Sequence, residues 1–587
     1  MHLRASLVAL VLLAACAHGP RGPDGQPLWV EAESEHFVLR ADLSAEDVRA
    51  SIEKLEQIRQ GLLVSSWSAK TQPPAKTHVI LLADLDELNE YVRRGIDGFA
   101  TSDPFDAPLL VATAETSLED VTVLKHEMAH QVDNVFLLRQ PRWLSEGLAS
   151  YLETIQLARD GSSVTVGKAN LDRFNYLRRY PVVDLKWVMA QGPGIYSQSR
   201  EEANMFYSQS WLLVDYLANR RRQAFSAWLA RLARAEDPAV SFATVFAGIS
   251  ITQLENEVHE YMNSGSFTTM RFPLPPLNST VTLRPLSAAD ARAELALLRS
   301  LSFGQATAGT AARAATEAEQ ALRADPQSPL AAGVWFATGK RSRDEQIAVA
   351  RAVVAGHPDD SRGFELLGIA LGASAGTEQA DALETALRLA PGDARVLANL
   401  SFNYLTQQRG QEGLIAAQKS VQLAPGNPSY LDNYAVALAN TGHCTEAPLM
   451  ERRAIEMVPE GAAAIDVAKH LERRISEFDQ MCSASKQGSS IPLVAVEEGT
   501  TPPRSAGACK PRKSFVRPPD LKPGTVLHIT FVISPEGKPI EVKLNGTPPA
   551  ALLKSVREYI EGCPFTAARG PHGTVRWPMS VNFTFAQ

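Results

Sequence analysis

Two histidines four residues apart, with a glutamate beside the first, are the residues of this sequence best suited to chemistry. They form the pentad HEMAH as His126, Glu127 and His130. On a helix, positions i and i+4 lie nearly on one face, so both imidazoles can reach one ion at about 2.0–2.1 Å. Glu127 then lies beside the ion, where it can take a proton from water. The pentad predicts a hydrolytic metal centre, which needs a third ligand and one open position.

Glu146, in the phrase PRWLSEGLASYLE, is the candidate third ligand. Pro141 ends the first helix, because proline lacks an N–H and disfavours helix in the residue before it. The chain can then turn, and a second helix can carry Glu146 across from the histidine pair. Gly147 has no side chain, so the two helices can approach closely there.

HEMAH followed by PRWLSEGLASYLE resembles the gluzincin metallopeptidases, and P-x-W-L-x-E-G-L-A is most similar to their bacterial peptidase-MA-like relatives. The resemblance implies that His126, His130 and Glu146 hold one Zn²⁺ ion and that Glu127 is the general base. Fifteen residues separate His130 from Glu146, a few fewer than such enzymes usually have. Glu153 is therefore the alternative third ligand.

The segments around the pentad predict a mixed sheet with helices. Strands are expected at residues 36–42, 77–84 and 108–115, and a helix at 44–63, from their alternating and helical periodicities. In gluzincins the strand before the metal helix lies along the cleft, so the resemblance implies that residues 108–115 can pair with an extended substrate. A short hairpin is expected at 162–167.

A helix at residues 204–217 carries Tyr207. In enzymes similar to the M1 aminopeptidases, a tyrosine on such a helix donates to the oxyanion, and Tyr207 matches that position best; Tyr151 and Tyr196 compete for the role. Further helices are expected at 224–234 and 251–262. The expected core of this helical half is Trp211, Leu213, Phe225 and Trp228.

Two related enzyme classes fit less well. A metzincin needs a third histidine at the position that Phe136 holds. An M1-like aminopeptidase reads the substrate N-terminus with a G-x-M-E-N strand, whereas the corresponding stretch here is PLLVATAE. The second departure favours an endopeptidase.

The first residues of the chain predict export and lipidation. Arg4 precedes a short apolar run at residues 7–13, and Leu-Ala-Ala-Cys, ending at Cys16, matches the bacterial lipobox. The resemblance implies cleavage before Cys16, a lipid anchor, and, because Ala17 follows, the outer membrane of a bacterial envelope. The alternative is an ordinary secretory signal. The net charge of −7, without a basic run, argues against a nucleic-acid binder.

Proline recurs at a nearly constant interval in the second half of the chain. Each proline ends a similar phrase, such as ALRADP or ALRLAP, and the positions are Pro326, Pro358, Pro391, Pro425 and Pro459. A period near 34 with a proline after the second helix resembles the tetratricopeptide repeat (TPR). Such helical pairs stack into one solenoid, whose concave face is expected to bind an extended peptide or protein. Asn399, Asn403 and Asn433 are candidates for that face.

The last segment of the chain predicts the order β-β-α-β, with strands at 526–533 and 575–585. With FVISPEGKP and PFTAA it resembles the TonB C-terminal domain, which implies an interaction module. Four cysteines remain in an exported chain, which favours disulfides. Three pairings are possible, and Cys444–Cys482 with Cys509–Cys563 is favoured because each pair falls within one domain.

The expected fold is thus multidomain: an α+β gluzincin-like domain, an all-α TPR solenoid and a small α+β (ββαβ) TonB-like domain. The expected divisions are a signal peptide at 1–15, a tether at 16–33, the peptidase domain at 34–271, the repeats at 286–484, a linker at 485–508 and the C-terminal domain at 509–587. The sequence favours a lipid-anchored zinc peptidase that acts on proteins or peptides, with partner binding by the repeats and the C-terminal module. The alternative is an inactive envelope scaffold that binds proteins through its repeats.

Overall fold

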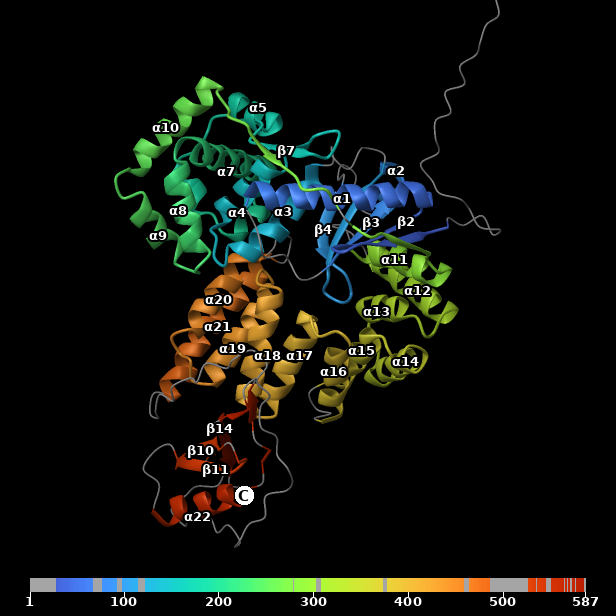
Figure 1. Cartoon of the computed structure of the whole chain (residues 1–587), viewed down its shortest axis with the longest axis vertical. Coiled ribbons are helices and arrows are strands. Elements are labelled where there is room, and N and C mark those ends of the chain that lie inside the picture. The colour runs from blue at the N-terminus through green and yellow to red at the C-terminus, as the bar shows by residue number, and fades with distance from the viewer. Residues whose placement is uncertain are drawn as a thin grey trace, which may run out of the picture.

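The computed structural model of the chain (Figure 1) describes residues 28–66, 76–91, 98–114, 122–277, 279–301, 308–372, 377–458, 464–485, 526–534, 536–544, 550–563, 565–566, 568–570, 573–575 and 577–584. Several predicted features lie outside these residues: the signal peptide at 1–15, the lipidation site Cys16, nearly all of the linker at 485–508, and Cys509.

A six-stranded mixed sheet in the order β4-β5-β3-β2-β1-β9 organises the N-terminal half. The strands β2, β3 and β5 are parallel to one another, whereas β1, β4 and β9 run antiparallel to their neighbours. The three predicted strands and the mixed sheet are therefore confirmed. The strands are β1 (Val30–Glu33), β2 (Phe37–Ala41), β3 (Thr77–Leu82), β4 (Gly98–Ser102), β5 (Pro108–Thr113) and β9 (Thr282–Pro285).

Two predicted boundaries of the peptidase domain are wrong, because strands cross them. The predicted tether at 16–33 ends inside the sheet, since β1 begins at Val30 and Trp29 is already buried. The predicted end at residue 271 is too early, since β9 pairs with β1 beyond the proline-rich stretch. Both strands are only four residues long, which leaves too little alternation for the sequence to predict them.

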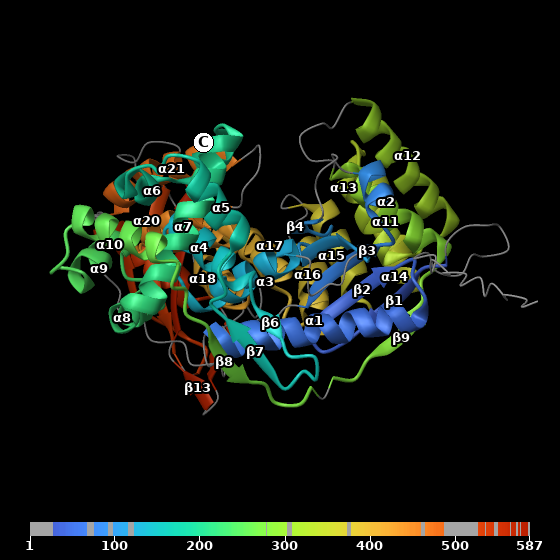
Figure 2. The same cartoon turned by 90° about the horizontal axis from the view of Figure 1, so that it is seen from above.

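Helices cover both faces of the sheet, as Figure 2 shows. Alternate strand residues such as Leu39 and Leu81 pack with α1 and with α3 (Thr122–Phe136), whereas Ile80 and Val111 point to the other face. That other face is covered by α2 (Leu85–Tyr91) and by the first repeat helices. The helix α1 (Ala45–Ser66) buries its predicted apolar face completely: Val48, Ile52, Leu55, Ile58 and Leu62.

A helical half follows the segment that contains HEMAH. Its helices surround a core that includes all four predicted residues, Trp211, Leu213, Phe225 and Trp228. A small antiparallel sheet β6-β7-β8 lies beside it, with the predicted hairpin as its first two strands. The elements are β6 (Gln156–Leu157), β7 (Ser163–Val166), α5 (Leu171–Arg179), α6 (Leu185–Ala190), the 3₁₀ helix η1 (Pro193–Ser197), α7 (Arg200–Arg220), α8 (Arg222–Leu232), α9 (Pro238–Val245), α10 (Ile251–Ser264) and β8 (Met270–Pro273).

Helical pairs from α11 to α21 form an arc beneath the sheet (Figure 1). The pairs recur with the proline period, so TPR-like repeats are confirmed. The helices are α11 (Ala288–Ser300), α12 (Ala308–Ala324), α13 (Pro329–Ala337), α14 (Arg343–Gly356), α15 (Ser361–Leu371), α16 (Thr377–Leu389), α17 (Ala394–Thr406), α18 (Gly410–Leu423), α19 (Pro428–Asn440), α20 (Ala447–Glu456) and α21 (Ala464–Ser485).

The asparagines predicted for the ligand face have mainly structural contacts. Asn403 is completely buried and donates to Gln379, and Asn433 donates to the carbonyl of Ala398 at 2.7 Å. Both link neighbouring helices, because a buried amide must find partners for its donors. Asn399 is half-buried on α17.

Both ends of the array contact the N-terminal half of the chain. At the start, Arg40 of β2 forms a buried ion pair with Glu294 of α11. At the end, Arg139 pairs with Glu456 of α20, and Arg453 donates to the carbonyl of Leu138 at 2.7 Å. The repeats therefore share the core of the sheet and also hold the turn after α3, instead of following a separate linker.

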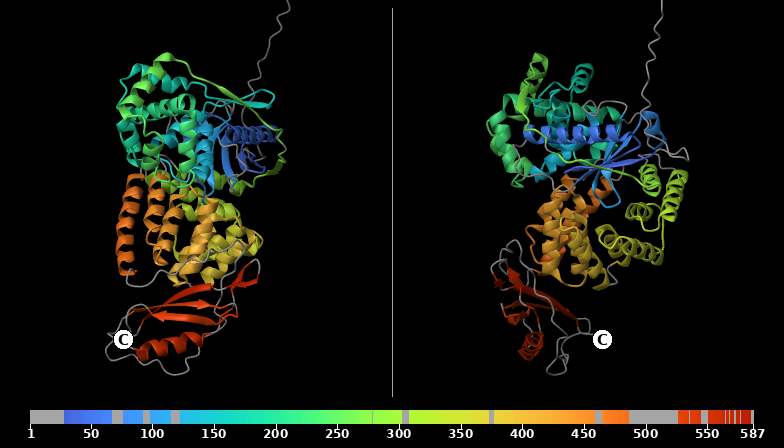
Figure 3. Two further views of the ribbon diagram at one scale, coloured as in Figure 1. Left: turned by 60° about the vertical axis from the view of Figure 1, so that its left-hand side comes forward. Right: turned by 45° about the vertical axis from the view of Figure 1, so that its right-hand side comes forward.

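The C-terminal domain lies at the far side of the repeats from the sheet in both views of Figure 3. Its strands form an antiparallel sheet β11-β10-β14, and the predicted order β-β-α-β is confirmed, with one additional small hairpin, β12-β13. The elements are β10 (Val526–Ile533), β11 (Pro539–Leu544), α22 (Ala550–Glu561), β12 (Ala568–Gly570), β13 (Gly573–Val575) and β14 (Trp577–Thr584).

Cys444 and Cys563 each form a disulfide. The side chain of Cys482 and all of Cys509 lie outside the described residues, so the favoured pairing stays a prediction. Within the part of the chain that the structure describes, no helix is both long and apolar enough to cross a bilayer.

Candidate metal centre

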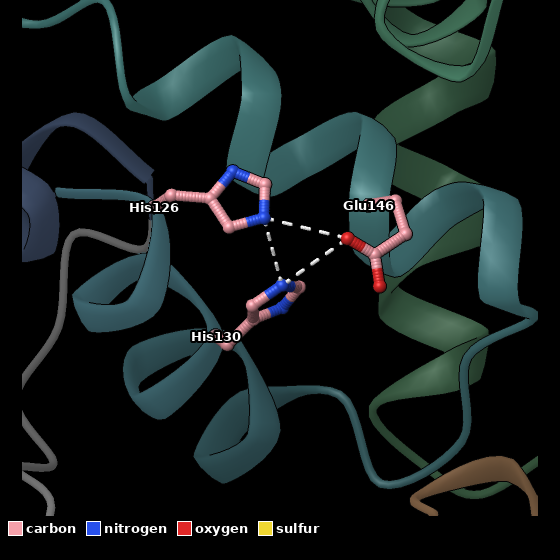
Figure 4. A group of neighbouring side chains, drawn as sticks. All are labelled: His126, His130 and Glu146. Atoms are coloured by element: carbon pink, nitrogen blue, oxygen red, sulfur yellow. Dashed lines mark hydrogen bonds and ion pairs between the residues drawn. The ribbon is translucent and has the colours of Figure 1, made fainter. Parts of the chain in front are cut away.

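The helices α3 (Thr122–Phe136) and α4 (Arg142–Leu152) carry the predicted ligands. Pro141 is the N-cap of α4 with φ −69°, so the chain turns there as the sequence predicts. The side chains of His126, His130 and Glu146 point to one place between the two helices (Figure 4).

The three ligand atoms form a nearly equilateral triangle. The Nε2 atoms of His126 and His130 are 3.2 Å apart, and each is 3.4 Å from Oε2 of Glu146. The side chains are 12%, 19% and 5% exposed, respectively, so little water competes for these atoms. This triangle is the central geometric feature of the site.

The triangle fits one tetrahedral zinc ion. Zinc binds imidazole nitrogen and carboxylate oxygen at about 2.0–2.2 Å, so neighbouring tetrahedral ligands lie about 3.3–3.5 Å apart. The edges of 3.2 and 3.4 Å agree with that spacing. Two imidazoles and one carboxylate are also a ligand set of catalytic zinc sites, where three protein ligands leave a fourth position open.

Neighbouring side chains orient both rings for metal binding. His126 donates through Nδ1 to Oε2 of Glu153 at 2.6 Å, and Asn170 donates to the other Glu153 oxygen. Nδ1 of His130 lies 3.2 Å from Oγ of Ser145. A proton on Nδ1 leaves the lone pair on Nε2, which is the tautomer that binds a metal. The alternative of Glu153 as third ligand is therefore wrong, because Glu153 contacts the far side of the ring.

Burial and charge act in opposite directions at the site. Burial lowers the pKa of His126, but the carboxylates of Glu146 and Glu153 outweigh it and hold that pKa well above its usual value. Burial raises the pKa of Glu146, but His130 and His126 outweigh it and hold that pKa well below. The pocket thus favours positive charge beside an ionised Glu146.

Glu127 and Tyr207 lie around the ligands. Glu127 is half-buried beside the histidines, and its charge contributes to the raised pKa of both. The ring of Tyr207 has its centroid 6.4 Å from that of His126, and the guanidinium of Arg173 lies 4.9 Å from the Tyr207 centroid. A tyrosine on α7 therefore borders the site where the sequence predicts it.

The two competing tyrosines differ in what the structure describes. Tyr151 is 6% exposed, and its hydroxyl would lie 3.0 Å from a Cβ added to Gly167. Its hydroxyl thus packs against the backbone of another loop. The side chain of Tyr196 lies outside the described residues.

Gly147 sets the distance between α4 and α7. A Cβ at this position would lie 2.5 Å from the carbonyl oxygen of Ser210 and 2.6 Å from Val214. The predicted close approach exists, but the partner of α4 is α7 and not α3. Because Tyr207 is one turn from Ser210, this packing also positions Tyr207 relative to Glu146.

The strand predicted to pair with a substrate is the wrong one. The strand β5 already has neighbours on both sides, β4 and β3, so its backbone groups are paired. The end strand next to β5 is β4, which the sequence did not predict; the opposite end strand of the sheet is β9. An extended substrate that adds to this sheet would therefore pair with β4.

Sequence analysis missed two supporting residues, Ser145 and Asn170, and assigned a third, Glu153, to the wrong role. Ser145 lies inside α4 and Asn170 is the N-cap of α5, and neither residue type carries a chemical signature at such a position. Glu153 follows Glu146 by two helical turns, so both carboxylates face one side of α4, and that spacing carried a signal for the pair. Which of the two carboxylates faces Nε2 of His126 and which faces Nδ1 depends on tertiary geometry.

Comparisons with known proteins bear on separate parts of the chain. A family model described as "Protein of unknown function (DUF1570)" matches residues 120–238, which include the metal centre. No curated protein matches the chain.

Solved structures match part of the chain, at low identity. A thermophilic TPR protein of Thermus thermophilus is 19% identical over 33% of this chain and 100% of its own, with a TM-score of 0.26. The pilF protein of Pseudomonas aeruginosa is 21% identical over 34% of this chain and 88% of its own, with a TM-score of 0.24. MamA is 19% identical over 25% of this chain and 89% of its own, with a TM-score of 0.22.

Proposed function

We propose that this protein is a single-zinc peptidase of the bacterial cell envelope that cleaves protein substrates. The observation that carries the proposal is the triangle of His126, His130 and Glu146, with edges of 3.2 and 3.4 Å. These three residues would hold the ion through Nε2, Nε2 and Oε2. Zinc supplies Lewis acidity, which polarises a carbonyl group and acidifies water.

The remaining steps belong to side chains of this chain. Glu127 takes a proton from the attacking water on its carboxylate and delivers it to the leaving amine nitrogen. The hydroxyl of Tyr207 donates a hydrogen bond to the oxygen on which negative charge develops. Glu153 keeps the proton of His126 on Nδ1, and this holds the ring in one orientation.

The other parts of the chain suggest where the enzyme works. The lipobox ending at Cys16 supports a lipid anchor in the outer membrane. The TPR-like repeats and the TonB-like C-terminal module would bind partners, which favours a protein over a short peptide as substrate. The strand β5 in this protein has no G-x-M-E-N phrase, which favours internal cleavage over removal of N-terminal residues.

A second candidate function is an envelope scaffold without peptidase activity. The repeats, which reach from α11 to α21, favour it because TPR-like arrays are protein-binding folds. Against it stands the complete set of Glu127 and the three ligands, together with Glu153 behind His126. A scaffold would not need an oriented imidazole pair.

The substitution Glu127→Gln separates the two functions. It removes the base but no ligand, so zinc content should equal that of the parent while cleavage falls about 10²–10⁴-fold. The measurement is zinc by mass spectrometry together with proteomics of envelopes that contain parent or variant. Equal cleavage patterns in both strains would exclude the peptidase mechanism and leave the scaffold.

A further inference from the structure

The turn between β4 and β5 reaches out of the sheet into the arc of repeats. Asp103 holds this turn in shape: its Oδ1 accepts from the amides of Phe105 at 2.8 Å and Ala107 at 2.9 Å. Oδ2 of Asp103 lies 2.7 Å from Nδ1 of His78 on β3. The turn is therefore a preformed unit that presents Phe105 and Asp106 together.

Phe105 fills a slot made by two repeat helices. A Cβ added to Gly333 of α13 would lie 2.6 Å from Cε2 and Cζ of the Phe105 ring, so only glycine leaves room for the ring. The guanidinium of Arg362 on α15 lies 5.7 Å from the ring centroid. The Phe105 ring thus packs between the backbone of α13 at Gly333 and the guanidinium group of Arg362.

Asp106 is recognised by hydrogen-bond donors from α19 and its N-cap. Its Oδ2 accepts from the hydroxyl of Tyr430 at 2.5 Å and from Nδ2 of Asn427 at 3.0 Å. Beside it, Arg395 of α17 donates to the carbonyl of Pro104. Asp106 has φ +62°, a conformation that costs a non-glycine residue energy and that these contacts offset.

These contacts come from corresponding helices of four successive pairs, α13, α15, α17 and α19. A groove built from one residue of each pair is the usual ligand surface of a solenoid. Gly333, Arg362, Arg395 and Tyr430 form this groove, which we call the turn groove. We propose that the turn groove is a recognition site for a tight turn with an aromatic residue followed by an acid, that the β4–β5 turn occupies it in cis, and that a partner protein presenting the same pair binds there by displacing that turn.

The array does not need the turn to stay attached. A buried apolar core joins α11 and α13 to the sheet through residues such as Leu297 and Val334. By contrast, Asp106 is half-buried and is held by polar contacts, and Phe105, also half-buried, packs only at the margin of that core, beside the Arg362 guanidinium. Half-buried polar contacts exchange with competing partners more readily than a packed core does. Binding at the turn groove requires neither metal nor peptidase activity.

A cyclic peptide with the sequence of residues 102–108, carrying a fluorophore, is the probe. Removing the cis ligand by Phe105→Ala with Asp106→Ala should make the full chain bind the probe at least about tenfold more tightly than the parent, because a tethered ligand competes at millimolar effective concentration. Fluorescence anisotropy measures both affinities. If the double variant elutes and unfolds like the parent but binds no more tightly, the proposal is wrong.

Variants of the groove test recognition in that emptied background. Tyr430→Phe removes one donor to a carboxylate and should weaken probe binding about tenfold or more. Tyr404→Phe on α17, whose hydroxyl bonds to Glu384, is the matched control and should change nothing. Gly333→Ala should abolish binding by filling the slot. Binding that is insensitive to both groove substitutions would overturn the proposal.

Hydrogen–deuterium exchange of the parent chain tests the displacement of the turn without any substitution. Saturating probe should displace the turn, so the amides of Phe105 and Ala107, which bond to Asp103, should exchange with solvent deuterium faster. Probe that binds while both amides keep their protection would show that it binds elsewhere, and the turn groove would lose its assigned role.

Discussion

Two buried acids of this protein, Glu146 of the candidate metal centre and Glu451 of the repeats, have pKa values shifted in opposite directions. Glu146 lies between two histidines, which outweigh its burial and hold its pKa well below the usual value. Glu451 is completely buried on α20, where burial and the neighbouring Asp432 raise its pKa to about 9. A buried carboxyl is thus ionised only where cations surround it. Glu146 is available as an anionic ligand, whereas Glu451 keeps its proton.

The largest expected effect comes from removing the ionised acid. Glu146→Ala takes away one of three ligands and should reduce zinc in the dialysed protein from one ion per chain to none. Glu451→Ala removes an acid of equal size and should leave the zinc content unchanged. Mass spectrometry of metal content compares the two variants. Equal zinc in both would mean that the ion is bound elsewhere.

The next largest effect is expected from removing the hydroxyl group of Tyr207, which borders the candidate metal centre. Tyr207→Phe should lower kcat about 10²–10³-fold, because the transition state loses one hydrogen-bond donor, while zinc content stays constant. The control is Tyr151→Phe, since that hydroxyl packs against Gly167. Rates on a substrate identified by envelope proteomics provide the comparison. An unchanged kcat for Tyr207→Phe would remove the tyrosine from the mechanism.

A smaller effect is expected from Glu153, which contacts His126 on the side away from the proposed ion. Glu153→Gln keeps the size of the side chain but weakens its bond to Nδ1 of His126, so zinc affinity should fall about 10–100-fold. Titration with a competing chelator measures the change, and Glu260→Gln, an exposed acid on α10, is the control. Affinity equal to the parent would show that Glu153 does not orient the ring.

The smallest effect is on the repeats and depends on pH. Because folding raises the pKa of Glu451 from 4.5 to about 9, its contribution to stability is fully present below pH 4.5 and is lost as pH rises toward 9. Glu451→Gln has no such proton to lose. The Tm of the parent should therefore fall relative to the variant between pH 5 and pH 9 in scanning calorimetry.

The control for this pH effect is Glu472→Gln, an exposed acid on α21. It should keep the pH dependence of the parent. A parent and a Glu451→Gln variant with parallel Tm curves would contradict the assigned protonation of Glu451 and weaken the contrast with Glu146.

The sequence predicted what depends on neighbours along the chain. The spacing of His126 and His130, and the proline before the helix of Glu146, are local features that follow from helix geometry. The repeats were predictable for a similar reason, since one phrase recurs at a constant interval.

Contacts between distant residues were not predictable. Arg139 and Glu456 are separated by 317 positions, and Asp106 and Tyr430 by 324, and no periodic pattern links either pair. The short strands β1 and β9 are also far apart in the sequence, so their pairing could not be predicted from a local pattern. The sequence thus predicted the three side chains that converge at the candidate metal centre, but not the residues that attach the repeats to that region.

X-ray absorption at the zinc edge of the purified full chain tests the central claim most directly. We expect one zinc ion per chain with only nitrogen and oxygen neighbours at about 2.0–2.2 Å and two imidazole signatures, which disappear in Glu146→Ala. A chain that takes up no zinc, or zinc with sulfur neighbours, would contradict the account.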